Sequence, residues 1–184
     1  MTWPTSAVVD TERLRLRVLR REDAGAIAAH MSNWNVTRML SMPPWPYGQS
    51  DAEEFLDRIL ARAIDDPDCS RAIAERETDM LIGIIGGRPS GAHYTIGYWL
   101  GEPYWGRGYM TEAVTSIVGA IFTSDEHAVI KSGVFKDNPA SLRVQKNVGF
   151  RIVGESRILC RPRGEKVTHV DTELTFDAFR RRRS

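Results

Sequence analysis

Residues 96–114 constrain the fold more than any other part of the chain: I-G-Y-W-L-G-E-P-Y-W-G-R-G-Y-M-T-E-A-V. Before the glycines, every second residue from Tyr94 to Leu100 is large and apolar, the alternation of a half-buried strand. After them, apolar residues fall at i, i+3, i+4, i+7, i+8 and i+11 from Met110, forming the single stripe of an amphipathic helix. The sequence therefore predicts a strand, a glycine-rich turn and a helix, in that order.

This arrangement predicts an anion-binding site. A strand that leads through a glycine-rich turn into a helix presents unpaired backbone N–H groups and the positive end of the helix dipole, which suit a phosphate or pyrophosphate. A P-loop would need a lysine and a hydroxyl residue where Tyr109 and Met110 follow Gly108, and a dinucleotide fingerprint would need a third glycine. The alternative is an ordinary surface turn before a core helix.

The start of the chain predicts a strand and a helix. Over residues 12–19, Arg13, Arg15 and Arg17 alternate with apolar residues, which indicates a half-buried strand whose arginines lie in water. Apolar spacing then predicts a helix over about residues 22–32.

The rest of the chain reads as one further early helix, the central helix, a later helix and several strands. A capping box at residues 50–53 predicts a helix that D-D-P-D at residues 65–68 would end. The later helix lies within residues 138–150, N-P-A-S-L-R-V-Q-K-N-V-G-F: Asn138 caps it, Pro139 occupies its first position and Gly149 closes it. The remaining expected strands are residues 70–76, 80–87, 128–135, 150–159 and 166–176.

The helical wheel assigns directions to the side chains of this later helix. At 100° per residue, Ser141 shares a sector with Val144 and Val148, so its hydroxyl faces the apolar side. Arg143 and Lys146 point the other way, toward solvent or an anion. A bond from Ser141 to the carbonyl one turn back is the purely structural alternative.

Two blocks of the chain resemble one family. Y-W-G-R-G-Y-M-T-E-A resembles the coenzyme A pyrophosphate loop of the GCN5-related N-acetyltransferases, the GNAT superfamily. The block 138–150 resembles the fourth-helix signature of the RimJ/RimL-like subgroup, which acetylates ribosomal-protein N-termini. Trp105 and Met110 replace the first and last residues of the loop pattern, a small departure because backbone amides do the binding. The resemblance covers about residues 11–178.

The resemblance implies an α/β fold with a mixed, mostly antiparallel sheet of six or seven strands and about four flanking helices. The strand ending at Leu100 should splay from the strand 128–135, and the acetyl-pantetheine arm should insert there and pair with the exposed backbone, like an added strand. Acetyl-CoA is the implied co-substrate. The residues expected to bind it are Tyr98, Trp99, Leu100, Trp105, Gly106, Arg107, Gly108, Tyr109, Met110, Thr111, Asn138 and Lys146.

The implied chemistry is direct acetyl transfer to a neutral amine, without a covalent enzyme intermediate. A backbone N–H near Trp99 or Leu100 stabilises the oxyanion, and Ser141 protonates the departing sulfur. Some relatives carry a catalytic glutamate on the strand after Gly-Phe, but residues 156–164 hold no carboxylate, and Cys160 stands near the expected place. The substitutes are His93, whose ordinary pKa is the most suitable, Glu102, Glu155 or a water chain.

The acceptor is expected to be a primary amine, most simply the N-terminal α-amine of a peptide or protein. Trp34, Trp45 and Tyr47 lie in a proline-rich loop and are the candidate acceptor-binding residues, with structural packing as the alternative. A small-molecule amine acceptor and a non-catalytic coenzyme A-binding module remain as other functions.

Composition bounds the remaining possibilities. A chain of 184 residues suits one domain with a core at 11–178 and a basic tail at 180–184. The net charge of +1 argues against nucleic acid as a partner of that tail. Neither a membrane-spanning run nor a leader is evident, so we expect a cytoplasmic monomer or homodimer. Cys69 and Cys160 lack metal-ligand spacing, and we expect no metal.

Overall fold

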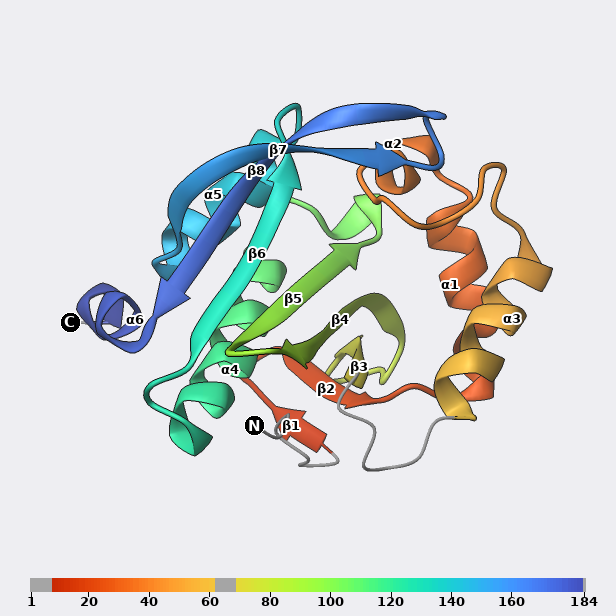
Figure 1. The fold of residues 1–184 in the computed structure, drawn as a ribbon. Coiled ribbons are helices and arrows are strands. Elements are labelled where there is room, and N and C mark those ends of the chain that lie inside the picture. The colour runs from red at the N-terminus through yellow and green to blue at the C-terminus, as the bar shows by residue number, and fades with distance from the viewer. Residues whose placement is uncertain (1–7, 62–68, 184) are drawn as a thin grey trace.

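The computed structural model describes residues 8–61 and 69–183, and its centre is an eight-stranded sheet (Figure 1). The strand order is β1-β2-β3-β4-β5-β6-β8-β7, and only β5 and β6 pair in parallel. The strands are β1 (Val8–Asp10), β2 (Leu14–Val18), β3 (Cys69–Glu75), β4 (Leu81–Ser90), β5 (His93–Leu100), β6 (Val129–Phe135), β7 (Arg151–Cys160) and β8 (Glu165–Thr175).

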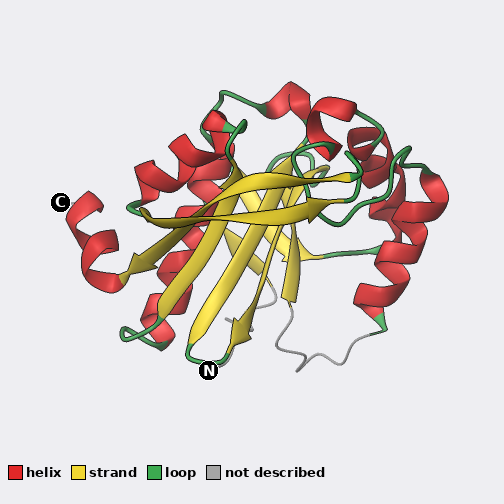
Figure 2. Ribbon diagram, turned by 45° about the horizontal axis from the view of Figure 1, so that its top comes forward, coloured by secondary structure: helices red, strands yellow, loops and turns green. Residues whose placement is uncertain are grey.

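Helices cover both faces of this sheet (Figure 2). One face packs against α4 and α5, and the other against α1 and α3, with a separate apolar core on each side. The helices are η1 (Arg21–Asp23), α1 (Ala24–Met31), α2 (Trp34–Thr37), α3 (Gln49–Leu60), η2 (Glu102–Tyr104), α4 (Tyr109–Ser124), α5 (Pro139–Val148) and α6 (Phe176–Arg183). No described helix is long and apolar enough to cross a bilayer.

The expected fold class is confirmed. The apolar stripe of α4, from Met110 to Ile121, is buried against the sheet, and Tyr94, Ile96 and Leu100 of β5 pack in the same core. The described residues hold eight strands and six α-helices, more than expected. Two of the additional elements are too short to show a period: β1 has three residues and α2 has four. The third, α6, includes most of the expected basic tail.

The expected splay lies between β5 and β6. These strands pair at only two positions, Tyr94 with Ile130 and Thr95 with Lys131. Beyond them β6 continues with β8 on its other side. The parallel pair therefore opens toward the carboxyl ends of both strands, where the chain enters the glycine-rich turn and the cap of α5.

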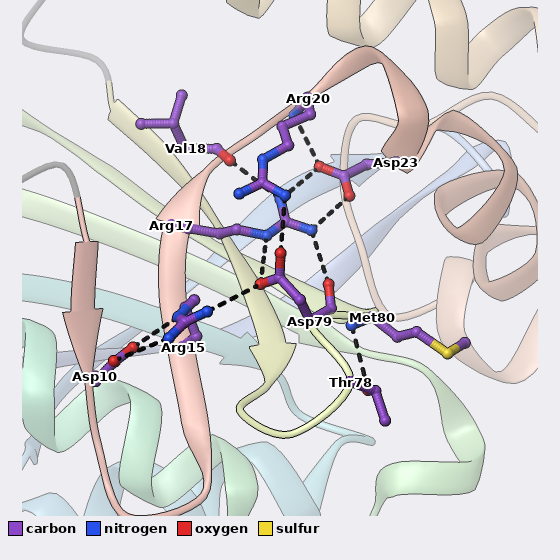
Figure 3. Close-up of polar contacts among 9 residues, drawn as sticks. All are labelled: Asp10, Arg15, Arg17, Val18, Arg20, Asp23, Thr78, Asp79 and Met80. Atoms are coloured by element: carbon purple, nitrogen blue, oxygen red, sulfur yellow. Dashed lines mark hydrogen bonds and ion pairs between the residues drawn. The ribbon is translucent and has the colours of Figure 1, made fainter.

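The prediction that all three early arginines lie in water is wrong for Arg17, which is 3% exposed. Its guanidinium bonds Asp23 at 2.8 and 2.9 Å and Asp79 at 3.1 Å (Figure 3). Val18 is exposed instead. The burial arises because η1 and the turn between β3 and β4 bring two carboxylates over this end of β2, which periodicity along β2 alone does not reveal.

The start of α3 also differs from prediction. The helix begins at Gln49 with Gly48 as its cap, and the carboxylate of Asp51 accepts a hydrogen bond from the Gly48 N–H at 2.8 Å. The predicted capping residue, Ser50, lies inside the first turn. Residues 65–68, predicted to end the helix, lie outside the described residues.

Candidate active site

A cavity of about 1260 Å³ occupies the splay of the sheet. Its walls come from β5 and β6, the glycine loop (residues 105–108), the first turn of α4, and α5. Strands β7 and β8 and the segment after α2 complete it. The cavity thus joins the glycine-rich turn to the carboxyl-terminal parts of β5 and β6 and to the middle of β7 and β8.

Hydrogen bonds from Gln145 of α5 show which side chains face each side of this cleft. Its amide nitrogen donates to Ser132 Oγ on β6 at 3.0 Å, and its amide oxygen accepts from Thr172 Oγ1 on β8 at 2.7 Å. Because side chains alternate along a strand, Gly133 and Asp171 point away from α5, toward the face that α1 covers. We call these faces the α5 side and the α1 side.

The glycine loop lies directly before α4, at the position where the sequence predicts an anion cradle. Gly106 and Gly108 have φ of +73° and +80°, conformations that L side chains rarely adopt. A β-carbon on Gly106 would meet nothing within 4 Å, so the space in front of that backbone is open. Tyr109, Met110 and Thr111, whose N–H groups open the 16-residue helix, line the cavity.

Arg13 clamps this loop, a role that the alternating pattern of β2 did not reveal. Its Nη1 donates to the carbonyl of Arg107 at 2.9 Å, and its guanidinium lies 4.6 Å from the ring centre of Tyr109. The same guanidinium pairs with Glu112 at 2.7 Å. Burial alone would raise the pKa of Glu112, but its bonds from Thr11 and Arg13 outweigh burial and lower that pKa. The ionised carboxylate thus holds Arg13 beside the loop.

Ser141 and Asn138 lie where the helix pattern predicts. The side-chain oxygen of Asn138 accepts a bond from the Ser141 N–H at 3.1 Å, which caps α5. The Ser141 hydroxyl donates to the phenolic oxygen of Tyr98 at 3.1 Å, across the α5 side of the cleft. Burial, the largest influence, raises the pKa of Tyr98 despite its bonds to Ser141 and Gln145. A neutral phenol and a hydroxyl therefore face the cavity together.

The cavity gathers most of the predicted coenzyme-binding residues and omits two. The indole N–H of Trp105 donates to the Leu100 carbonyl at 2.8 Å, which fixes the loop to the end of β5. Arg107 and Lys146 are exposed and do not line the cavity, whereas Arg143 does. The predicted residues that line it are Tyr98, Trp99, Leu100, Trp105, Gly106, Gly108, Tyr109, Met110, Thr111, Asn138 and Ser141.

The predicted candidates for a general base lie elsewhere. His93 stands at the opposite end of β5, paired with Ser90 beside the β4–β5 turn, and does not line the cavity. Glu102 accepts bonds from the side chains of Asn33 and Asn35, which tie η2 to α2.

The last candidate, Glu155, and the residue near the expected glutamate position, Cys160, are engaged in other contacts. Glu155 pairs with Lys136 at 2.9 Å, with both side chains exposed. Cys160 is a fully buried free thiol whose sulfur lies 3.4 Å from the carbonyl of Leu40. Neither residue lines the cavity.

The three aromatic residues predicted to bind the acceptor also lie outside the lining. Trp34 and Trp45 pack against each other with ring centres 4.8 Å apart, each about two-fifths exposed. Tyr47 is buried in the core beneath α1 and α3, where burial raises its pKa to about 12. Four residues of the same irregular stretch line the cavity instead: Val36, Met39, Leu40 and Ser41.

The turn between β7 and β8 explains this difference. The Arg161 N–H donates to the Ser41 carbonyl at 2.9 Å, and Arg163 Nε donates to the Arg38 carbonyl at 2.7 Å. The long β7–β8 hairpin reaches across to α2 in Figure 1. These bonds hold the segment after α2 over the cleft, a placement that depends on residues about 120 positions away.

The α1 side of the cleft contains a pair that the sequence-based prediction missed. Nδ1 of His169 lies 2.7 Å from Oδ1 of Asp171, and the Ser156 hydroxyl donates to the same oxygen at 3.0 Å. Both His169 and Asp171 line the cavity. The available signal was the alternation of His169, Asp171 and Glu173 along one face of a strand that is otherwise half-buried.

Comparison with known proteins identifies the family. The model of the acetyltransferase (GNAT) domain matches residues 13–151. The chain belongs to the GNAT family. Its relatives include the uncharacterized N-acetyltransferase p20 of Bacillus licheniformis, 29% identical over 78% of this chain and 82% of p20. Another is the uncharacterized N-acetyltransferase YoaA of Bacillus subtilis, 29% identical over 82% and 86% of the two chains. The expected family and enzyme class, an acyltransferase, are confirmed.

Solved structures share this GNAT fold. RimJ of Mycobacterium smegmatis, solved in complex with CoA-disulfide, has a TM-score of 0.82 at 20% identity over 96% of this chain and 91% of its own. The ribosomal-protein-S5-alanine acetyltransferase of Vibrio fischeri has a TM-score of 0.77 at 18% identity over 94% of this chain and 98% of its own. At such identities, these likenesses establish the fold.

Proposed function

We propose that this GNAT protein transfers the acetyl group of acetyl-CoA to the N-terminal α-amine of a peptide or protein. The observation that carries the proposal is the anion cradle of Gly106 and Gly108, which opens into a cleft through the splay of β5 and β6. The site therefore offers a pyrophosphate position and, beyond it, a passage between two strands. The solved structures named RimJ and ribosomal-protein-S5-alanine acetyltransferase support the acceptor class.

The residues of the cleft fit acetyl-CoA. Backbone N–H groups of the glycine loop and the first turn of α4 suit its pyrophosphate. Arg143 of α5 also lines the cavity and adds a positive charge. Past Thr95, β5 pairs with no strand on its β6 side within the described residues. The Ile96 carbonyl accepts a hydrogen bond from Ser132 Oγ at 3.0 Å, and the backbone edge beyond it is available to an extended amide-containing chain. The pantetheine arm has this chemistry.

The chemistry is an acyl exchange between sulfur and nitrogen. The neutral amine forms a C–N bond to the thioester carbonyl, an oxyanion develops, and the C–S bond breaks as the thiolate leaves. The Ser141 hydroxyl, bonded to the Tyr98 phenol, is the donor that returns a proton to the sulfur. A backbone N–H near Trp99 or Leu100 stabilises the oxyanion in this proposal.

The acceptor class follows from the protonation state that the attack needs. An α-amino group titrates near pH 7.7–8.0 and a lysine near 10.4, a gap of about 2.5 units. At neutral pH the N-terminal amine is therefore ~300-fold richer in its reactive neutral form, equivalent to about 3.4 kcal/mol. Three carboxylates line the described part of the cleft, and none is free to draw a proton from lysine: Glu173 and Asp137 are paired with arginines, and Asp171 lies 2.7 Å from Nδ1 of His169.

Two matched peptides test the proposal. One has a free N-terminus and no lysine, and the other has the same sequence with an acetylated N-terminus and one internal lysine. We expect kcat/KM at neutral pH to favour the free N-terminus by more than about tenfold, because of the difference in neutral amine. A preference for the lysine peptide across several flanking sequences would contradict the acceptor class.

Two other outcomes identify the alternative functions. Turnover of small amines without turnover of any peptide would indicate a small-molecule acetyltransferase. Binding of acetyl-CoA in a calorimeter without turnover of any amine would indicate a non-catalytic binding module. Either result replaces the proposed function.

A further inference from the structure

His169 is the only histidine among the described residues that line the cleft. Its Nδ1 lies 2.7 Å from Oδ1 of Asp171, and Ser156 donates to that same oxygen and holds the carboxylate in place. An ionised carboxylate can only accept, so the hydrogen of this bond lies on Nδ1. The lone pair of the neutral imidazole is therefore on Nε2.

The ring of His169 reaches the strand that borders the splay. A β-carbon on Gly133 of β6 would lie 2.1 Å from Cε1 and 2.8 Å from Nε2, so the imidazole covers this glycine. Gly133 is two residues past Lys131, the last residue at which β6 pairs with β5. The glycine thus gives the ring room beside the open part of the sheet, on the α1 side and across from Ser141.

The other ionisable groups of the cleft are less suited to accept a proton. Glu173 is bonded by Arg151 at 2.5 and 3.1 Å, and Asp137 by Arg163 at 2.9 and 3.2 Å. Both carboxylates are thus held by guanidinium groups, and protonated lysine and arginine side chains have no lone pair that could accept a proton. An imidazole titrates near neutral pH, the range in which a general base is most efficient.

We infer that His169 is the general base of acetyl transfer and that Asp171 is its positioning residue. As the amine nitrogen forms its bond to the carbonyl carbon, Nε2 of His169 accepts the proton that the nitrogen loses. The C–S bond breaks and the sulfur receives a proton from Ser141; the serine oxygen is reprotonated from solvent as the imidazolium releases its proton, so that atoms and charge balance. Asp171 keeps the hydrogen on Nδ1 and stabilises the imidazolium that forms. This inference rests on the proposed function.

The surroundings of His169 define the expected pH dependence. It faces Asp171 on its own strand, Ser156 on β7, and Gly133 and Phe135 on β6; only Asp171 among them is charged. Lys131 and Glu173 lie farther along the same faces, and Arg163 stacks on Phe135 at 5.1 Å. We therefore expect kcat/KM to fall in acid as the imidazole becomes protonated.

The first experiment compares His169→Asn with the wild-type enzyme on the free-N-terminal peptide. The asparagine amide can still donate to Asp171 but offers no basic nitrogen. We expect kcat/KM to fall by roughly 10²–10⁴-fold, with the calorimetric affinity for acetyl-CoA unchanged. His127→Asn, at a histidine that is 91% exposed and outside the cleft, is the matched control and should keep wild-type activity. His169→Gln serves if the asparagine variant does not fold.

The second experiment reads the role of Asp171 through a pH profile. Asp171→Asn removes the charge that favours the imidazolium, so the acid limb of kcat/KM should move to lower pH. A purely structural role would lower activity without moving this limb, and that result would overturn the role of Asp171.

The outcomes separate this inference from the proposed function. If the wild-type enzyme acetylates the peptide and both His169 variants stay within threefold of its kcat/KM, the base assignment is wrong and the proposed function stands. A large loss in His93→Asn with none in His169→Asn would move the base to His93. If the wild-type protein acetylates no amine, the proposed function is wrong and the base assignment fails with it.

Discussion

Two ionic groupings near opposite ends of one sheet, around Arg17 on β2 and around His169 on β8, are built in opposite ways. Arg17 has five N–H donors, and five hydrogen bonds engage them: to Asp23, to the carboxylate and carbonyl of Asp79, and to the Val18 carbonyl (Figure 3). His169 engages one ring nitrogen with Asp171, and the other lies over Gly133 at the cleft.

The difference separates residues that hold the fold from residues available for chemistry. A guanidinium stays charged at all relevant pH and has a planar arrangement of donors. A buried arginine whose donors are all hydrogen-bonded therefore has a purely structural role. An imidazole changes charge near neutrality and has two distinct nitrogens, so a histidine anchored through one of them retains a reactive site. The comparison predicts stability effects at Arg17 and activity effects around the cleft.

Replacing Arg17, whose N–H donors are all hydrogen-bonded, should have the largest effect on stability. Arg17→Leu leaves the carboxylate of Asp23, which is only 5% exposed, without its ion-pair partner, and it removes one of the arginines that bond Asp79. Breaking a buried ion pair on one side costs about 3–5 kcal/mol, and we expect this loss in the free energy of unfolding measured by urea titration.

Arg15 of the same strand is the matched control. It pairs with Asp10 at 2.9 Å, and both side chains are more than a third exposed. Arg15→Leu should lower the free energy of unfolding much less than Arg17→Leu does, because solvent screens such pairs. Equal losses of unfolding free energy in Arg17→Leu and Arg15→Leu would contradict the contrast between a buried, fully hydrogen-bonded arginine and a surface ion pair.

A smaller effect, on activity and with little change in stability, is expected at Ser141. Ser141→Ala removes the hydroxyl bonded to Tyr98 and leaves the Ser141 N–H that Asn138 caps. We expect kcat to fall by about 10²-fold, equivalent to about 2.7 kcal/mol, because a thiolate is already a tolerable leaving group. Single-turnover kinetics beside calorimetry of acetyl-CoA binding measures this; a near-normal kcat would reduce Ser141 to a capping position.

The smallest effect concerns the pH dependence of stability at Asp79. Burial alone would raise the pKa of Asp79, but hydrogen bonds and charges from Arg20 and Arg17 outweigh it and lower that pKa below its ordinary 3.8. A lowered folded-state pKa means that the ionised carboxylate stabilises the fold above pH 3.8, and this stabilisation is lost as pH falls through the folded-state pKa.

Asp79→Asn should therefore be less stable than the wild-type protein at pH 7, and the gap should narrow as the pH falls below 3.8. Thermal unfolding of both proteins over this range measures the gap. A constant gap at all pH values would show that the loss comes from packing and not from the charge on Asp79.

Much of this site was predictable from local patterns. The positive φ of Gly106 and Gly108, the stripe of α4 and the cap at Asn138 each depend on residues within a few positions of one another. The direction of Ser141 followed from the helical wheel for the same reason.

The residues that the patterns misplaced depend on distant partners. The β7–β8 turn holds the segment after α2 over the cleft. The predicted acceptor residues Trp34, Trp45 and Tyr47 therefore lie outside it. The sequence predicts a strand around each of His93 and His169 and does not distinguish them. The register of β8 on β6 places His169 beside the splay, whereas His93 pairs with Ser90 at the other end of β5.

By itself, the sequence determined the main strands and helices, the glycine-rich turn before α4 and the family. These are consequences of hydrophobic period, glycine conformation and helix capping, which act over one or two turns of chain. The tertiary structure alone decided that Arg17 is buried, that Arg13 clamps the glycine loop, and that His169 faces the cleft. Each of these depends on groups brought together from remote parts of the chain. Burial and ion pairing, which the residue type alone does not reveal, determine whether a charged side chain stabilises the fold or takes part in chemistry.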